Sequence, residues 1–145
     1  MFSDDEAVRR IGRAFEDLSL PAKEWTHAAH CAAATYILVE RRDLVAERDM
    51  PGMIRRYNLA QGGRNTDTEG YHETLTQFYL VAIRKKLAGL DADAALHAKV
   101  NAVLSGPIGQ SDFPLRYYRR ETLWSAEARA AWRAPDLLPL EQLAV

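Results

Sequence analysis

Residues 25–40 read WTHAAHCAAATYILVE, a stretch without glycine or proline that carries five alanines. Alanine has the highest helix propensity, and its small side chain lets neighbouring elements pack closely against the helix. Apolar residues occur on both sides of the helix that this stretch would form, which is typical of a central and mostly buried helix. We expect this helix to begin at about residue 22–26 and to continue to about residue 48.

Helical patterns continue on both sides of this stretch, and no segment shows the alternating pattern of a strand. We therefore predict an all-α protein, with residues 1–145 forming a single-domain helical bundle of about five helices and an irregular C-terminal wrap. The further helices are expected over residues 4–18, 49–62, 67–88 and 91–105, with a shorter one near 126–133.

Local signals mark the starts of several of these helices. Ser3 with Glu6 and Thr66 with Glu69 match the capping-box spacing, in which a hydroxyl and a carboxylate satisfy the first free amides. Pro51, just after Asp49, is placed as a proline in the first turn would be. Ser125 is a plausible N-cap of the short helix near the C-terminus.

The bulk composition narrows the classes of partner and location. The formal net charge is −1 with both signs interspersed, so the sequence lacks the basic stripe expected of a nucleic-acid-binding protein. The single cysteine rules out an internal disulfide, and no apolar run approaches the ~20 residues of a membrane span. The N-terminus does not resemble a signal peptide. We predict a cytoplasmic protein without a nucleic-acid or membrane partner; its apolar segment 137–140 could also dock on a second copy and form a homo-oligomer.

The histidines give the most direct indication of chemistry. His27 and His30 are spaced i,i+3, so both imidazoles project from one side of the central helix. His72, followed by Glu73, lies at the start of a second long helix. Imidazoles on facing helices can hold a divalent transition metal, most readily zinc or iron, with a position left for water or substrate. We therefore predict a mononuclear metal site formed by His27, His30 and His72, with Glu73 as acid or base, or as a hydrogen-bond partner of a ligand.

Three further residues are expected to bind a substrate. Arg41 shares the helical stripe of His27 and His30, and a buried arginine needs an anionic partner such as a carboxylate or phosphate. Asn58 and Tyr71 would line the same pocket, although a hydrogen bond between helix and loop is the simpler explanation of Asn58. The resulting hypothesis is a small metal-dependent enzyme that acts on a small anionic substrate, as a hydrolase with zinc or as an oxygenase with iron.

Other interpretations of the same residues remain open. The pairs Glu24-x-x-His27 and Glu69-x-x-His72 resemble the ligands of di-metal bundles, but no bridging glutamate is obviously placed. The histidines could instead form a structural cluster with tyrosines, or line the pocket of a non-catalytic small-molecule-binding or accessory protein. Haem binding is a third possibility. Cys31 is expected to be a small buried apolar group rather than a reactive thiol.

The motifs also support a resemblance. The segments W25-T-H-x-x-H30 and G70-Y-H-E-T74, together with the tail from Tyr117 to Leu137, make the chain similar to an uncharacterised family of small bacterial proteins. The similarity extends from about residue 20 to 140. It implies that these segments belong together in one fold, and it implies no activity, cofactor or substrate.

Overall fold

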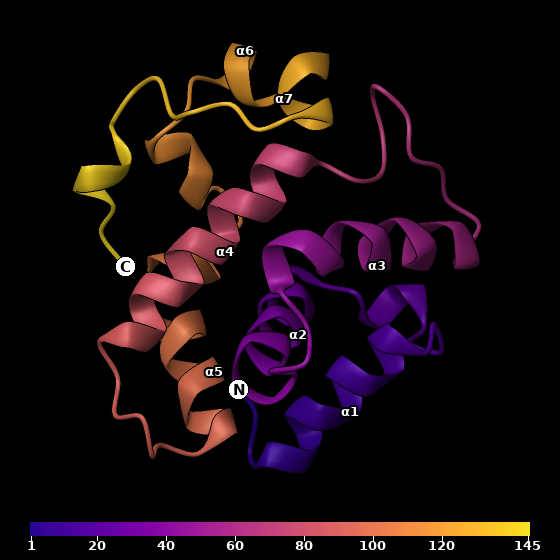
Figure 1. Cartoon of the computed structure of the whole chain (residues 1–145), viewed down its shortest axis with the longest axis vertical. Coiled ribbons are helices and arrows are strands. Elements are labelled where there is room, and N and C mark those ends of the chain that lie inside the picture. Colours follow the sequence, from indigo (N-terminus) through magenta and orange to yellow (C-terminus); the bar gives the residue numbers. More distant parts are fainter.

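The computed structural model describes all residues from Met1 to Val145 and is entirely helical, without a β-strand. The predicted all-α class is therefore confirmed. Seven α-helices are joined by short loops and by four 3₁₀ turns (Figure 1). The α-helices are α1 (Asp5–Glu16), α2 (His27–Glu40), α3 (Ala46–Ala60), α4 (Glu73–Ala88), α5 (Leu96–Ser105), α6 (Arg120–Leu123) and α7 (Ala126–Ala130).

Helix α2 is the centre of the bundle, as the alanine-rich stretch predicts. In Figure 1 it is viewed nearly along its axis, and α1, α3, α4 and α5 lie around it. Ala32 and Ala33 are completely inaccessible to solvent, and all residues from Cys31 to Ile37 are buried. The small alanine side chains allow neighbours to approach on several sides, so a helix with little amphipathic character is stable at this position.

The single long helix expected from the alanine-rich stretch is in fact two helices. Helix α2 stops at Glu40, where Arg41 turns away and pairs with Asp43, with Nη2 and Oδ2 2.9 Å apart. Helix α3 begins earlier than expected because the Asp49 carboxylate accepts a hydrogen bond from the N–H of Val45 (2.8 Å). Asp49 therefore caps α3 from inside its first turn rather than preceding the helix.

Pro51 lies inside α3, and its effect on the helix is compensated by α4. Proline has no N–H, so the carbonyl of Glu47, four residues earlier, has no intrahelical partner. The Nε2 amide of Gln77 in α4 donates a hydrogen bond to this carbonyl (2.9 Å). The break in the helical ladder thereby becomes a contact between two helices.

Helix α4 begins six residues later than the expected residue 67. The hydroxyl of Thr66 accepts hydrogen bonds from the N–H groups of Thr68 and Glu69, but the segment closes as a turn rather than as a helix. Gly70 has a φ of 83°, in the left-handed region, which ends any helical path. The N-cap is His72, whose Nδ1 accepts a hydrogen bond from the N–H of Leu75 (3.1 Å).

Two other caps can be compared with their predictions. Asp4 rather than Ser3 caps α1, because its carboxylate accepts a hydrogen bond from the N–H of Ala7 (2.8 Å). Ser125 caps α7 as predicted, by accepting a hydrogen bond from the N–H of Ala128 (3.1 Å). A short polar side chain at either of two adjacent positions can satisfy the same free amides, so spacing alone does not choose between them.

The chain beyond α5 wraps around α4 in short turns, as expected. The buried ring of Phe78 in α4 contacts the rings of Phe113, Tyr117 and Tyr118, with centroids between 5.4 and 5.7 Å apart. The hydroxyl of Tyr118 donates a hydrogen bond to the carbonyl of Arg133 (2.6 Å). Aromatic packing and a few long-range hydrogen bonds therefore fix a segment that has little regular structure of its own.

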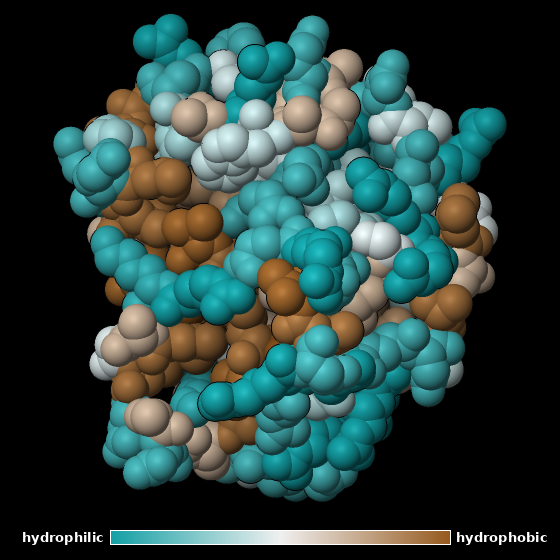
Figure 2. Space-filling model, in the orientation of Figure 1, coloured by the Kyte–Doolittle hydropathy of each residue, from teal (hydrophilic) through white to brown (hydrophobic).

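Hydrophilic residues cover most of the face shown in Figure 2, and hydrophobic residues gather on the side where α4 meets the C-terminal segment. The exposed apolar side chains of the molecule include Val81 in α4 and Leu137 and Leu138 in the C-terminal segment. None of the helices combines the length and the apolar character that crossing a bilayer requires.

The contact between α1 and α2 depends on the absence of a side chain at Gly12. A Cβ atom at this position would lie 2.3 Å from Cδ2 of Tyr36, which is buried. We expect Gly12→Ala to lower the free energy of unfolding by about 1–3 kcal/mol, because a packed ring cannot move aside. Urea denaturation measures this change.

Gly52→Ala in α3 is the matched control. Its Cβ would meet only the guanidinium end of Arg56, at 3.1 Å, which can move. Here the higher helix propensity of alanine should leave stability unchanged or raise it by about 0.5–1 kcal/mol. Equal effects of the two substitutions would contradict the packing explanation.

Candidate functional site

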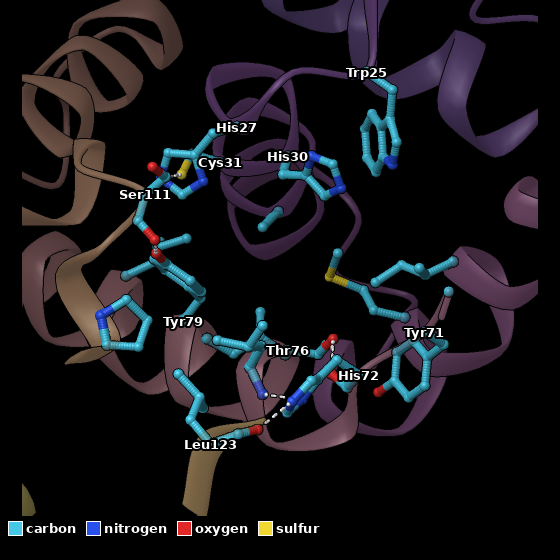
Figure 3. A pocket seen from close by; sticks show the side chains of 18 of the residues that line it. Trp25, His27, His30, Cys31, Tyr71, His72, Thr76, Tyr79, Ser111 and Leu123 are labelled. Carbon is cyan, nitrogen blue, oxygen red and sulfur yellow. Dashed lines mark hydrogen bonds between the residues drawn. The ribbon is translucent and has the colours of Figure 1, made fainter. Parts of the chain in front are cut away.

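A pocket of about 350 Å³ lies between the start of α2, α3, the start of α4 and the segment from Ser111 to Trp124 (Figure 3). Thirteen of its twenty lining residues are hydrophobic, and none is Asp, Glu, Lys or Arg. Four of the seven predicted site residues line it: His27, His30, Tyr71 and His72. The pocket is therefore the place where the two histidine segments meet.

His30 presents a free nitrogen to this pocket. Its Nδ1 lies 2.7 Å from the carbonyl of Thr26, which can only accept, so Nδ1 carries the proton and Nε2 carries a lone pair. His30 is an exposed residue, and its imidazole lines the pocket. The hydration that the ring loses there lowers the pKa of His30 to about 4. The Thr26 hydrogen bond opposes this shift, and nearby His27 adds to it. His30 is therefore a neutral hydrogen-bond acceptor near pH 7.

His27 is also fixed by a backbone carbonyl. Its Nε2 lies 2.9 Å from the carbonyl of Ile108, so Nε2 donates and Nδ1 is left without a partner within the protein. The Sγ atom of Cys31 lies 3.7 Å from the same Nε2. Burial raises the pKa of the Cys31 thiol to about 12, so it stays protonated. Cys31 is the small buried group that was expected, and nothing here activates it.

Both nitrogens of His72 take part in hydrogen bonds within the protein. Nε2 donates to the carbonyl of Leu123 at the end of α6 (2.7 Å), and Nδ1 accepts from the N–H of Leu75 (3.1 Å). Burial lowers the pKa of His72, and the cation of Arg129 lowers it further, whereas the hydrogen bond to Leu123 opposes the shift. His72 thus joins α4 to the C-terminal segment.

These hydrogen bonds bear directly on the predicted metal site. No group of three or more His, Cys, Asp or Glu side chains is arranged to hold a metal ion. In Figure 3, His27 and His30 extend from α2 on one side of the pocket, and His72 lies on the other. For three imidazoles to share one ion, His72 would have to give up at least the N–H of Leu75, because coordination through Nδ1 displaces it and coordination through Nε2 moves the proton to Nδ1. The three-histidine metal site stays a prediction, and this loss is its structural cost.

Glu73 lies beside the pocket and does not line it. Its carboxylate accepts a short hydrogen bond from the hydroxyl of Tyr71 and lies 3.4 Å from Nε2 of Gln77. Tyr71 lines the pocket with its ring, over which the guanidinium of Arg55 lies at 4.3 Å. Glu73, predicted as acid or base, and Tyr71, predicted to bind substrate, are therefore hydrogen-bonded to each other.

The remaining two predicted residues lie elsewhere. Arg41 is at the opposite end of α2 from the histidines, where its guanidinium pairs with the carboxylates of Glu16 and Asp43. The amide of Asn58 donates to the side chain of Asn65 in the following loop (3.0 Å). This is the helix-to-loop hydrogen bond considered above. Both side chains have protein partners, and neither lines the pocket.

Sixteen of the twenty lining residues were not predicted as site residues, among them Trp25, Ser111 and Trp124. The Trp25 ring packs on the imidazole of His30, with centroids 3.8 Å apart, and stacks on Phe15 at 4.6 Å. Trp25 precedes α2, so helical periodicity could not place it. Ser111 and Trp124 reach the pocket only because the C-terminal segment folds back, and no local signal indicates this.

Comparison of the chain with known proteins finds no related protein. No family model, no curated protein and no solved structure matches the chain. The resemblance to a family of small bacterial proteins therefore stays a prediction.

The neutral histidines predict how stability depends on pH. An unfolded histidine has a pKa of about 6.5, whereas the folded protein holds the pKa of His30 near 4 and also lowers that of His72. Between about pH 4 and 6.5 the unfolded chain therefore binds more protons, so the free energy of unfolding falls as the pH is lowered. Urea denaturation between about pH 5 and 7.5 measures this, above the range in which the paired carboxylates titrate.

In the variant His30→Gln this pH dependence should be shallower, because one of the two groups is removed. An equal free energy of unfolding of the natural protein at about pH 5 and 7 would contradict the lowered pKa values of His30 and His72.

Proposed function

We propose that the protein binds a small organic molecule in the pocket between α2 and α4, as a non-catalytic binding or accessory protein. The observation that carries this proposal is a concave and mostly apolar lining with a few polar atoms, among them Nε2 of His30 and Nδ1 of His27, that have no partner within the protein. Small-molecule sites have this composition, and about 350 Å³ falls within their usual range of about 300–1,000 Å³.

The lining favours binding over acid–base catalysis. Glu73 is engaged with Tyr71, and Cys31 is a protonated thiol. His30, with a pKa of about 4, holds too little basicity to remove a proton efficiently near pH 7. An anionic substrate would also lose its hydration without gaining a cation, because Arg41 pairs elsewhere. These features argue for a ligand that is held unchanged.

The test is binding of small neutral aromatic compounds, followed residue by residue by NMR of the ¹⁵N-labelled protein. Shifts should concentrate at lining residues, including the indole signals of Trp25 and Trp124 and not that of Trp132. The half-buried Ile54 lines the pocket from α3, so Ile54→Trp should fill it and weaken binding at least about tenfold, which is the loss of roughly 1.4 kcal/mol.

The control is Leu59→Trp on the same helix, at a position that is 60% exposed and outside the pocket. It should bind like the natural protein. Equal weakening by both substitutions, or shifts scattered over the surface, would contradict the proposal.

The competing hypothesis is the metal-dependent enzyme with His27, His30 and His72 as ligands. The free nitrogens of His27 and His30 are the observation in its favour. The observation against it is that both nitrogens of His72 form hydrogen bonds within the protein. Protein without an affinity tag, incubated with Zn²⁺ or Fe²⁺ and desalted, should retain less than about 0.3 equivalents if our proposal holds. Stoichiometric uptake that is lost in the double variant His27→Ala, His72→Ala would establish the metal site instead.

A further inference from the structure

We infer that the ligand of this pocket is an uncharged, mostly apolar molecule of about two rings, which donates one hydrogen bond to Nε2 of His30. This inference rests on the proposed function and specifies the chemistry of the ligand. It follows from three properties of the pocket: the absence of charge, the kind of polar atom left free, and the volume.

The absence of charge excludes ionic ligands. No carboxylate, ammonium or guanidinium lines the pocket, and the nearest arginines are engaged with the protein. Arg55 lies over the ring of Tyr71 at 4.3 Å, and Arg129 donates to the carbonyl of Gly70 (2.9 Å). A charged ligand would be desolvated here without a counter-charge, which is costly. A neutral ligand meets no such penalty.

The free polar atom that the protein holds in a fixed position is an acceptor, Nε2 of His30. Three donors of the lining are already used: Nε2 of His27 donates to Ile108, Nε2 of His72 to Leu123, and the hydroxyl of Thr76 to the carbonyl of His72 (2.9 Å). The indole N–H groups of Trp25 and Trp124 and the hydroxyl of Ser111 also line the pocket and have no partner within the protein. The Nε2 atom of His30 carries a lone pair that no group of the protein uses. A ligand that brings a donor, such as a hydroxyl or an N–H, can therefore bond to this lone pair.

The His30 ring is held in place before any ligand arrives. Its Nδ1–H is bonded to the carbonyl of Thr26, the residue that caps α2, and its face packs on the indole of Trp25. Figure 3 shows the ring extending from α2 toward the open space of the pocket. A fixed acceptor costs little conformational entropy when it forms a hydrogen bond, so it can discriminate between ligands.

The volume sets the size of the ligand. A protein cavity of about 150 Å³ holds benzene, so a pocket of about 350 Å³ suits a molecule of about two rings. Its aromatic lining residues, Trp25, Tyr71, Tyr79 and Trp124, favour a planar apolar body.

Three naphthalene compounds of similar size test this inference by calorimetry at neutral pH. 2-Naphthol can donate a hydrogen bond, 2-methoxynaphthalene cannot, and 2-naphthoate is an anion. We expect 2-naphthol to bind about three- to tenfold more tightly than 2-methoxynaphthalene, which is the usual effect of one hydrogen bond. The carboxylate should bind more weakly than both.

Two variants assign the preference to His30. His30→Phe keeps a ring of similar size without the acceptor, so the ratio of the two affinities should fall to about one while 2-methoxynaphthalene still binds. His30→Gln retains an acceptor and should restore part of the ratio. If His30→Phe does not fold, the comparison of the three compounds on the natural protein still tests the ligand class.

The outcomes separate this inference from the proposed function. Binding of none of the three compounds would overturn the proposed function as well. Binding without a preference for 2-naphthol, or with a preference for 2-naphthoate, would overturn the ligand class and leave the pocket as a binding site. A preference that is unchanged in folded His30→Phe would show that the hydrogen bond is made elsewhere, and would also overturn the inference.

Discussion

The neutral imidazole of His72 connects two parts of the chain that are far apart in sequence, and the pocket depends on this connection. One nitrogen accepts the hydrogen bond that caps α4, and the other donates to the carbonyl of Leu123 at the end of α6. Only the neutral ring can do both, because an imidazolium has two donors and no acceptor. Burial favours this neutral form by lowering the pKa of His72. The lining residues Leu123 and Trp124 are positioned by the same contact.

The residues around His72 strengthen the same junction. The hydroxyl of Thr74 donates to the carbonyl of Ala131 and accepts from the N–H of Arg133, both at 3.0 Å, and Arg129 donates to the carbonyl of Gly70. The segment G70-Y-H-E-T74 therefore binds the C-terminal wrap. Its residues have packing functions that a catalytic interpretation of the motif did not foresee, and this explains why so few of its polar atoms remain free for a ligand.

The sequence predicted the fold class and the central helix because both depend on local composition. The alanines of α2 are buried as expected, and Thr26 and Ser125 cap helices from within a few residues. Helix boundaries at Glu40 and Glu73 were wrong by several residues because distant or non-standard partners decide them. No local rule places an imidazole such as His72 at an N-cap.

The candidate site was predictable only in part for a related reason. Periodicity correctly brought His27 and His30 to one side of α2, and these residues line the pocket together with His72 and Tyr71. Arg41 shares their stripe, but it lies at the end of the helix, about 16 Å further along the axis from its spacing to His30. Helical periodicity predicts the side of the helix on which a residue lies, but not whether that residue lies near the pocket along the helix axis. Which ring nitrogens stay free depends on the carbonyls of Thr26, Ile108 and Leu123, and two of these are supplied by segments distant in sequence.

The low basicity of His30 and its suitability as a ligand acceptor have one physical cause. His30 is an exposed residue, but its imidazole lines a mostly apolar pocket, and the hydration that the ring loses there disfavours the imidazolium, so the lone pair on Nε2 stays unprotonated near pH 7. A neutral ligand that fills the pocket would displace water from this atom, which strengthens the hydrogen bond that the ligand donates to it. A proton and the ligand compete for one lone pair, and the pKa of about 4 means that the ligand meets no such competition near neutral pH. A more solvated histidine, with a pKa near 6.5, would be partly protonated there and would repel the same donor.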